Sequence, residues 1–131
     1  MSFFLKNTKA TGNMGEDIAC EYLRKTGFSI RARNVAKRVG EIDIVAQKGN
    51  TLHMVEVKTI QCARFGSERG KEDVYDPSTN LHQAKIRRVV RTGEWYVAQT
   101  NWEGEWQVDA VLVWIRKEDQ AIKVEYIPQI V

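Results

Sequence analysis

The stretch GEIDIVAQKGNTLHMVEVKT, residues 40–59, decides the fold of this chain. It contains two runs rich in β-branched and aliphatic residues, 41–46 and 52–59, and the polar segment between them carries Gly49 and Asn50. Two such runs joined by glycine and asparagine are typical of a β-hairpin. The sequence therefore predicts an antiparallel pair of strands with Gly49 and Asn50 at its tip.

A two-residue turn would place four charged side chains on one face of this hairpin. Asp43 would then lie directly across from Glu56, and Glu41 across from Lys58. Directly opposed carboxylates destabilise a sheet unless a positive charge lies between them. Lys58 would supply part of that charge, and a divalent metal held by Asp43 and Glu56 would supply the rest. The pattern thus predicts a metal site, and a metal beside a lysine can activate water for phosphodiester hydrolysis.

The alternative interpretation of this face is a polar surface, in which Glu41 and Lys58 form a cross-strand pair and the other charges are solvated. Apolar residues on the same face favour a covered site instead, because covered charges need partners. These residues are Val45, Leu52 and Met54. The opposite face is more apolar and is the better candidate for the main core contact, with Ile42, Ile44, His53, Val55 and Val57.

The segments on either side of the hairpin predict further helices and strands. Apolar residues recur at helical spacing from Gly15 to Thr26, and they alternate with polar residues from Phe28 to Arg33, as in a strand. A second helix is expected to begin at Ser78 or Thr79, where Gly93 either packs closely on the sheet or breaks the helix. Two final strands are predicted at 106–115 and 121–127. The order of elements predicts an α/β architecture with a mixed sheet flanked by helices.

The bulk properties indicate one domain over residues 1–131, with a flexible tail at 1–12 and a mobile loop at 60–77. The formal net charge is only +3, so attraction to polyanions must come from local clusters. Cys20 and Cys62 lack metal-ligand spacing, which indicates a reducing compartment. No apolar run is long enough for a signal peptide or a membrane span, so we expect a cytoplasmic protein without a membrane partner.

Basic residues on the second helix are the first candidate for a nucleic-acid contact. Arg87, Arg88 and Arg91 gather opposite its apolar arc with Lys85 at the edge, a stripe that could follow a phosphate backbone or could be an ordinary solvated face. A second candidate cluster comprises Arg31, Arg33, Lys37 and Arg38.

Glu16 is a further candidate carboxylate, on the first helix. It lies at the edge of that helix's apolar stripe, so it either faces the sheet or stabilises the first turn through the helix dipole. From the residues alone both interpretations stay open.

Several segments resemble the YraN family of proposed endonucleases. They are GNMGEDIACEYLRKTGF at 12–28, GEIDIVAQ at 40–47 and HMVEVKT at 53–59, with weaker similarity at 83–97 and 106–113. That family is similar to archaeal Holliday-junction resolvases and to PD-(D/E)xK restriction endonucleases. The resemblance implies a restriction-endonuclease-like mixed central β-sheet flanked by α-helices.

The resemblance also implies roles for individual residues. Asp43 and Glu56 correspond to the metal ligands, Lys58 to the catalytic lysine and Glu16 to the helix-borne carboxylate. Ile42 replaces the proline that precedes the aspartate in much of the superfamily, and Ile60 stands where a basic residue often follows the lysine.

The expected function is therefore endonucleolytic hydrolysis of DNA with Mg²⁺ or Mn²⁺ as cofactor, on branched or structured DNA. The related resolvases act as symmetric dimers, so a homodimer is plausible by the same resemblance. Two other functions stay open: a non-catalytic nucleic-acid-binding protein that retains the nuclease fold, and a protein-interaction scaffold.

Overall fold

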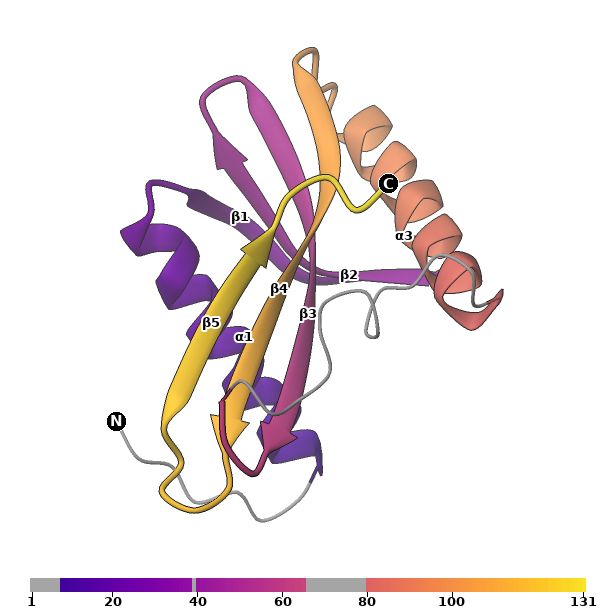
Figure 1. The fold of residues 1–131 in the computed structure, drawn as a ribbon. Helices are drawn as coiled ribbons and strands as arrows, with labels where there is room; N and C mark the ends of the chain where they lie inside the picture. The colour runs from indigo at the N-terminus through magenta and orange to yellow at the C-terminus, as the bar shows by residue number, and fades with distance from the viewer. Residues whose placement is uncertain (1–7, 39, 66–79) are drawn as a thin grey trace.

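The computed structural model describes residues 8–38, 40–65 and 80–131, without the side chains of 8–13 and 80–82. The described elements follow the predicted order of helix, three strands, helix and two strands (Figure 1). They are α1 (Thr8–Lys25), β1 (Ser29–Lys37), β2 (Gly40–Lys48), β3 (Thr51–Cys62), α3 (Asn80–Gln99), β4 (Glu105–Arg116) and β5 (Ile122–Ile127).

The strands form one sheet in the order β1-β2-β3-β4-β5. All neighbours are antiparallel except β3 and β4, which are parallel. Parallel neighbours need a long crossover, and the segment between β3 and β4 contains α3. The predicted α/β class with a mixed sheet flanked by helices is confirmed, and the architecture is consistent with a restriction-endonuclease-like fold.

The β2–β3 hairpin has the predicted register. Gly49 adopts a left-handed backbone conformation with φ of 60°, which a tight turn between Lys48 and Thr51 requires. Paired residues run from Lys48 and Thr51 to Ile44 and Val55. The pairing ends there, so the predicted direct pairs of Asp43 with Glu56 and of Glu41 with Lys58 do not form. The Val57 N–H instead donates to Asp43 Oδ2 at 2.8 Å. The ladder between β2 and β3 therefore stops where the two predicted carboxylates begin.

The two helices cover opposite faces of the sheet (Figure 1). The core under α1 includes Leu23, Ile44, Val55 and Val111, and the core under α3 includes Val45, Met54 and Val89. The part of this face that carries Val45, Met54 and Glu56 is therefore covered, as its apolar residues predicted, whereas Glu41 and Lys58 are exposed.

Ile42 lies on a different face from the one that simple alternation predicts. It belongs to the core under α3, whereas Ile44 belongs to the core under α1. The prediction that both share a face is wrong, because the alternation of side chains breaks at Asp43. At that residue the pairing of β2 with β3 has ended, whereas Ile42 still pairs with Val35 of β1.

Two glycines let the helices approach the sheet closely. A Cβ on Gly15 would lie 1.8 Å from Thr59 Oγ1, and a Cβ on Gly93 would lie 2.6 Å from Trp106 Cζ3. α3 continues unbroken through Gly93, so close packing is the correct one of the two predicted alternatives. This packing brings both helices near the point where β2 and β3 separate.

Some predicted boundaries differ from the structure. Residues 8–12 belong to α1 rather than to a tail, and β3 continues through Cys62, so the predicted loop begins no earlier than residue 63. The rest of the tail, most of the loop and the predicted cap at Ser78 or Thr79 lie outside the described residues. Neither α1 nor α3 combines the length and apolarity that crossing a bilayer demands.

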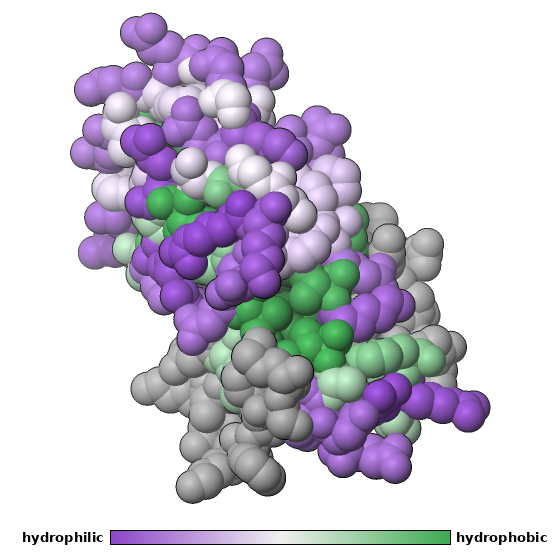
Figure 2. All heavy atoms as spheres, turned by 90° about the vertical axis from the view of Figure 1, so that its left-hand side faces the viewer, coloured by the Kyte–Doolittle hydropathy of each residue, from purple (hydrophilic) through white to green (hydrophobic). Residues whose placement is uncertain are grey.

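α1 leaves part of the sheet open beside β5. The hollow between them is lined mainly by apolar side chains: Met14, Ile18, Tyr22, Ile122 and Val124. Figure 2 views the molecule from this side and shows apolar side chains gathered among hydrophilic ones.

Candidate active site

Asp43 and Glu56 lie where β2 and β3 separate, and both are withdrawn from solvent. Glu56 is only 4% exposed, on a strand whose neighbours Val55 and Val57 point to the other face. Asp43 is partly buried and accepts a hydrogen bond from the Val57 N–H. The backbone of β3 thus orients the carboxylate of β2.

The negative charge of this pair is not fully compensated. The pKa of Asp43 is raised to about 6, first by burial and then by the charges of Glu56 and Glu16, against the opposing effects of the Val57 hydrogen bond and the Lys85 charge. The raised pKa means that the ionised form of Asp43 is destabilised, and a nearby cation would stabilise that form. A raised pKa in a partly buried carboxylate pair is also a feature of functional sites.

The positive charge against this pair comes from α3. Lys85 Nζ forms an ion pair with Glu56 Oε1. Burial lowers the pKa of Lys85, but the hydrogen bond to Glu56 and the charges of Glu56, Asp43 and Glu41 together raise it. The Lys85 ammonium group therefore lies near several carboxylates of β2 and β3.

Lys58 lies outside this set of contacts. Its side chain is exposed, and in the described part of the chain it takes part in no hydrogen bond or ion pair. The sequence predicted Lys58 as part of the compensating charge, with a metal as the rest, and placed Lys85 at the edge of the basic stripe on the second helix. The position of Lys85 on the helix was visible in the sequence, but how α3 crosses the sheet was not.

Glu16 faces the sheet from α1. Its Oε1 lies 3.6 Å from Arg33 Nη2 on β1, and its side chain is 17% exposed. Because α1 begins at Thr8, Glu16 lies beyond the first turn, which carries no acidic residue. The structure thus decides between the two interpretations of this residue: Glu16 adds negative charge near Asp43.

The donor set fits magnesium or manganese better than zinc. Among the described residues, no group of three or more histidine, cysteine, aspartate or glutamate side chains could hold one ion. Structural and catalytic zinc sites need three or four protein ligands. Mg²⁺ instead keeps several waters and is commonly held by one or two carboxylates, which Asp43 and Glu56 supply.

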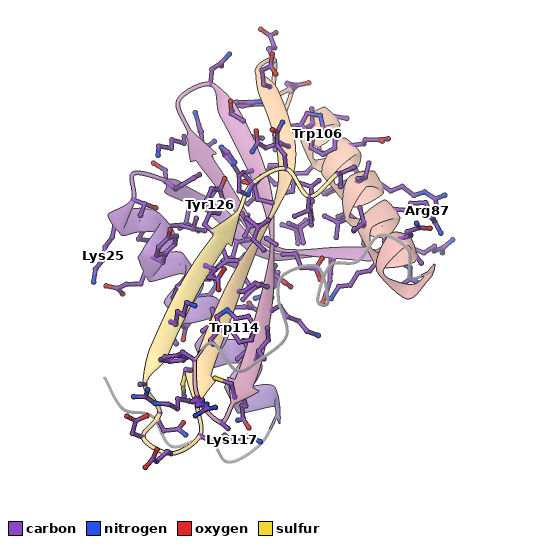
Figure 3. The ribbon with its side chains drawn as sticks, viewed as in Figure 1. Lys25, Arg87, Trp106, Trp114, Lys117 and Tyr126 are labelled. Atoms are coloured by element: carbon purple, nitrogen blue, oxygen red, sulfur yellow. The ribbon has the colours of Figure 1, made fainter. Side chains whose placement is uncertain are left out.

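A basic surface lies beside the carboxylates. Arg87, Arg88 and Arg91 are exposed on α3, and Figure 3 shows Arg87 directed away from the sheet. Gly40 lies against this helix, since a Cβ there would come 2.7 Å from Arg88 Cβ. A hollow of about 440 Å³ at this contact is lined by Ala36, Lys37, Arg38, Gly40, Glu41 and Arg88.

The structure thereby joins part of the two predicted basic clusters. Lys37 lies over the ring of Trp95 of α3, 3.8 Å from its centroid, and shares the hollow with Arg88. Arg33 does not contribute, because it pairs with Asp17 at 2.8 Å and with Glu16. We call Lys37, Arg38, Arg87, Arg88 and Arg91 the basic surface.

A second buried polar cluster lies among β3, β4 and β5. His53 Nδ1 lies 2.5 Å from Asp109 Oδ2, which also accepts a hydrogen bond from the Tyr126 hydroxyl at 2.6 Å. Gln107 Nε2 and the Gln129 N–H donate to Asp109 Oδ1 at 2.8 and 2.9 Å. His53, which the sequence placed on the more apolar face of the hairpin, is buried and has a partner. Asp109 was missed by the sequence analysis; its signal is a lone carboxylate inside the apolar run VDAVLV.

Comparison with known proteins identifies the family. The family model described as "Uncharacterised protein family UPF0102" matches residues 15–113. A UPF0102 protein of Campylobacter jejuni is 34% identical over 78% of this chain and 81% of its own length. A UPF0102 protein of Caldicellulosiruptor saccharolyticus is 32% identical over 92% and 96%, and one of Sulfurovum sp. is 35% identical over 80% and 84%. The match covers α1 from Gly15 onward, the hairpin, α3 and most of β4, so the chain belongs to the UPF0102 family, which is the YraN family that its motifs resemble.

Proposed function

We propose that this protein is a metal-dependent endonuclease that hydrolyses phosphodiester bonds in DNA. The observation that carries the proposal is the pair of withdrawn carboxylates, Asp43 and Glu56, beside a basic helix. Their combined negative charge favours binding of a divalent cation. The raised pKa of Asp43 supports this, because it shows that the ionised carboxylate is destabilised without further positive charge. The family resemblance supports the same chemistry.

In this proposal Asp43 and Glu56 hold Mg²⁺ or Mn²⁺. The bound ion would polarise a phosphoryl oxygen and lower the pKa of a bound water. Lys58, two residues after Glu56 on the same strand, orients the attacking water and offsets charge on the phosphate. Its exposure suits this role, because the substrate approaches from solvent.

The basic surface would bind the DNA backbone. Its cations come from α3 and from the end of β1, on the side of the sheet from which Lys85 reaches Glu56. Phosphate contacts of this kind position DNA without reading its sequence. Recognition by shape agrees with a branched or structured substrate, and a homodimer, as the resemblance implies, would present two such sites to it.

The test is cleavage of a DNA panel by purified protein. Linear, flapped and four-way DNA are incubated with Mg²⁺ or Mn²⁺ and, separately, with a chelator. We expect metal-dependent cutting of at least one substrate, lowered at least about 100-fold in Asp43→Ala and Glu56→Ala, as for loss of a metal ligand. Asp119→Ala, which removes an exposed aspartate far along the chain from the site, is the matched control and should keep full activity. Absence of cutting on every substrate would contradict the proposal.

A second candidate function is DNA binding without turnover. It is favoured by the basic surface, which includes neither of the proposed metal ligands. This function would give salt-sensitive DNA binding that persists in Glu56→Ala and does not change with metal. Binding assays at several salt concentrations, run beside the cleavage panel, separate the two functions.

A further inference from the structure

Lys85 is the side chain that pairs with Glu56. The two form an ion pair in which Glu56 is 5% exposed and Lys85 is 56% exposed at the side chain. Asp43 and Glu41 also act on the Lys85 charge. One ammonium group therefore serves several carboxylates at once.

The two members of this pair differ in how freely they can move. Glu56 is fixed by the backbone of β3 between the buried Val55 and the partly buried Val57, and a buried carboxylate without a partner is costly. Lys85 carries a compact charge on a flexible stem, and more than half of its side chain is already in solvent. Lys85 can therefore leave the pair at low cost, provided that another cation replaces it.

We infer that Lys85 is a tethered counter-ion that occupies the place of the metal on Glu56 and competes with the metal for that carboxylate. This inference rests on the proposed function, whose metal it concerns. An ammonium group and a divalent ion repel each other, so both cannot sit against the same carboxylate oxygen without a large loss of energy. Lys85 therefore stabilises the metal-free protein and weakens metal binding.

The test is to measure, without DNA, how tightly a variant that lacks the Lys85 charge binds metal. Lys85→Met keeps most of the aliphatic stem and removes the charge. In calorimetric titrations with Mn²⁺ and with Mg²⁺, we expect Lys85→Met to bind at least about five-fold more tightly than the wild type, which corresponds to about 1 kcal/mol. Without metal, its melting temperature should fall below that of the wild type, and saturating metal should close that gap.

Arg91→Met is the matched control. It removes one charge from an exposed position on the same helix, and Arg91 takes no part in the ion pair between Lys85 and Glu56. It corrects for the change in net charge, and we expect its metal affinity to stay within about two-fold of the wild type, as for a screened surface charge. Lys85→Gln repeats the test with a polar side chain should Lys85→Met fold poorly.

The outcomes distinguish this inference from the proposed function. Equal or weaker metal binding by both Lys85 variants overturns the competition, while metal binding by the wild type leaves the nuclease proposal standing. An equal gain in Arg91→Met also overturns it, because general electrostatics would then explain the effect. If neither the wild type nor any variant binds metal, the proposed metal site and the inference both fall.

Discussion

Two aspartates on strands of the same sheet have opposite environments. Asp109 on β4 is fully buried; burial alone would raise its pKa, but hydrogen bonds from His53, Gln129, Tyr126 and Gln107 lower it below its ordinary value. Asp43 on β2 accepts a hydrogen bond from the Val57 N–H, lies near two other carboxylates and has a pKa raised to about 6. The same side chain is therefore stabilised in its ionised form at one place and destabilised at the other.

This difference separates a structural site from a candidate functional one. A buried charge with a full set of donors holds its surroundings together and has no need of a ligand. A partly buried carboxylate pair with too little positive charge nearby destabilises the folded protein, and a bound cation would remove that destabilisation. The comparison thus supports Asp43 and Glu56, rather than the more completely buried Asp109, as the candidate metal site.

Removing Asp109 should have the largest effect on stability. Asp109→Ala would leave the buried His53 ring, the Tyr126 hydroxyl and the Gln129 N–H without their acceptor. We expect the free energy of unfolding to fall by about 3–5 kcal/mol, as for a buried pair that loses one partner. Urea denaturation measures it.

Asp43→Ala is the matched change in the other region. In metal-free buffer it should leave stability unchanged or raised, since it removes an unfavourable charge. A similar large loss in both variants would remove the contrast between the two aspartates.

Asp43→Asn should reveal the same contrast through pH. Because the folded pKa of Asp43 lies near 6 and the ordinary value is 3.8, the folded state binds this proton more tightly than the unfolded state. The stability contribution of Asp43 therefore rises as pH falls from about 6 to about 4, and it is unfavourable at neutral pH.

At pH 7 without metal we expect Asp43→Asn to be about 1–3 kcal/mol more stable than the wild type, with the difference vanishing below about pH 4. Thermal or urea unfolding across this pH range checks the prediction. A variant less stable than the wild type at neutral pH would show that the Asp43 carboxylate is well compensated. Added metal should reverse the order, because only the wild type keeps both ligands.

Lys58 should have the smallest effect on stability. Its side chain is exposed and, among the residues that the structure describes, makes no hydrogen bond or ion pair, so Lys58→Met should change the unfolding free energy of the metal-free protein by no more than about 0.5 kcal/mol. Lys85→Met, which breaks the pair with Glu56, should cost more. Equal losses in the two lysine variants would mean that Lys58 shares in compensating the carboxylates.

The hairpin was predictable in detail because its determinants are local. Gly49 and Asn50 set the turn, and the turn fixes the register from Lys48 and Thr51 outward. That register led to Asp43 and Glu56 as neighbours without any knowledge of the rest of the fold. Close packing of Gly93 was one of the two predicted alternatives for a related reason, since its place on the apolar arc of a helix follows from helical periodicity.

The irregular end of the hairpin could not be predicted in the same way. Alternation places Ile42 with Ile44, but Ile42 packs under α3 once β2 leaves β3. The hydrogen bond from the Val57 N–H to Asp43 depends on that separation. Local periodicity holds only while the ladder continues.

The sequence by itself determined the α/β class, the order of the elements and the two carboxylates, because turn chemistry and periodicity act between residues near one another in the chain. Only the tertiary structure decided which cation compensates Glu56, that Glu16 faces the sheet and that Asp109 is satisfied by its neighbours. Those contacts join α1, α3 and separate strands. They depend on where each element crosses the sheet, which is set by the packing of side chains such as those around Gly15 and Gly93 and not by any local pattern.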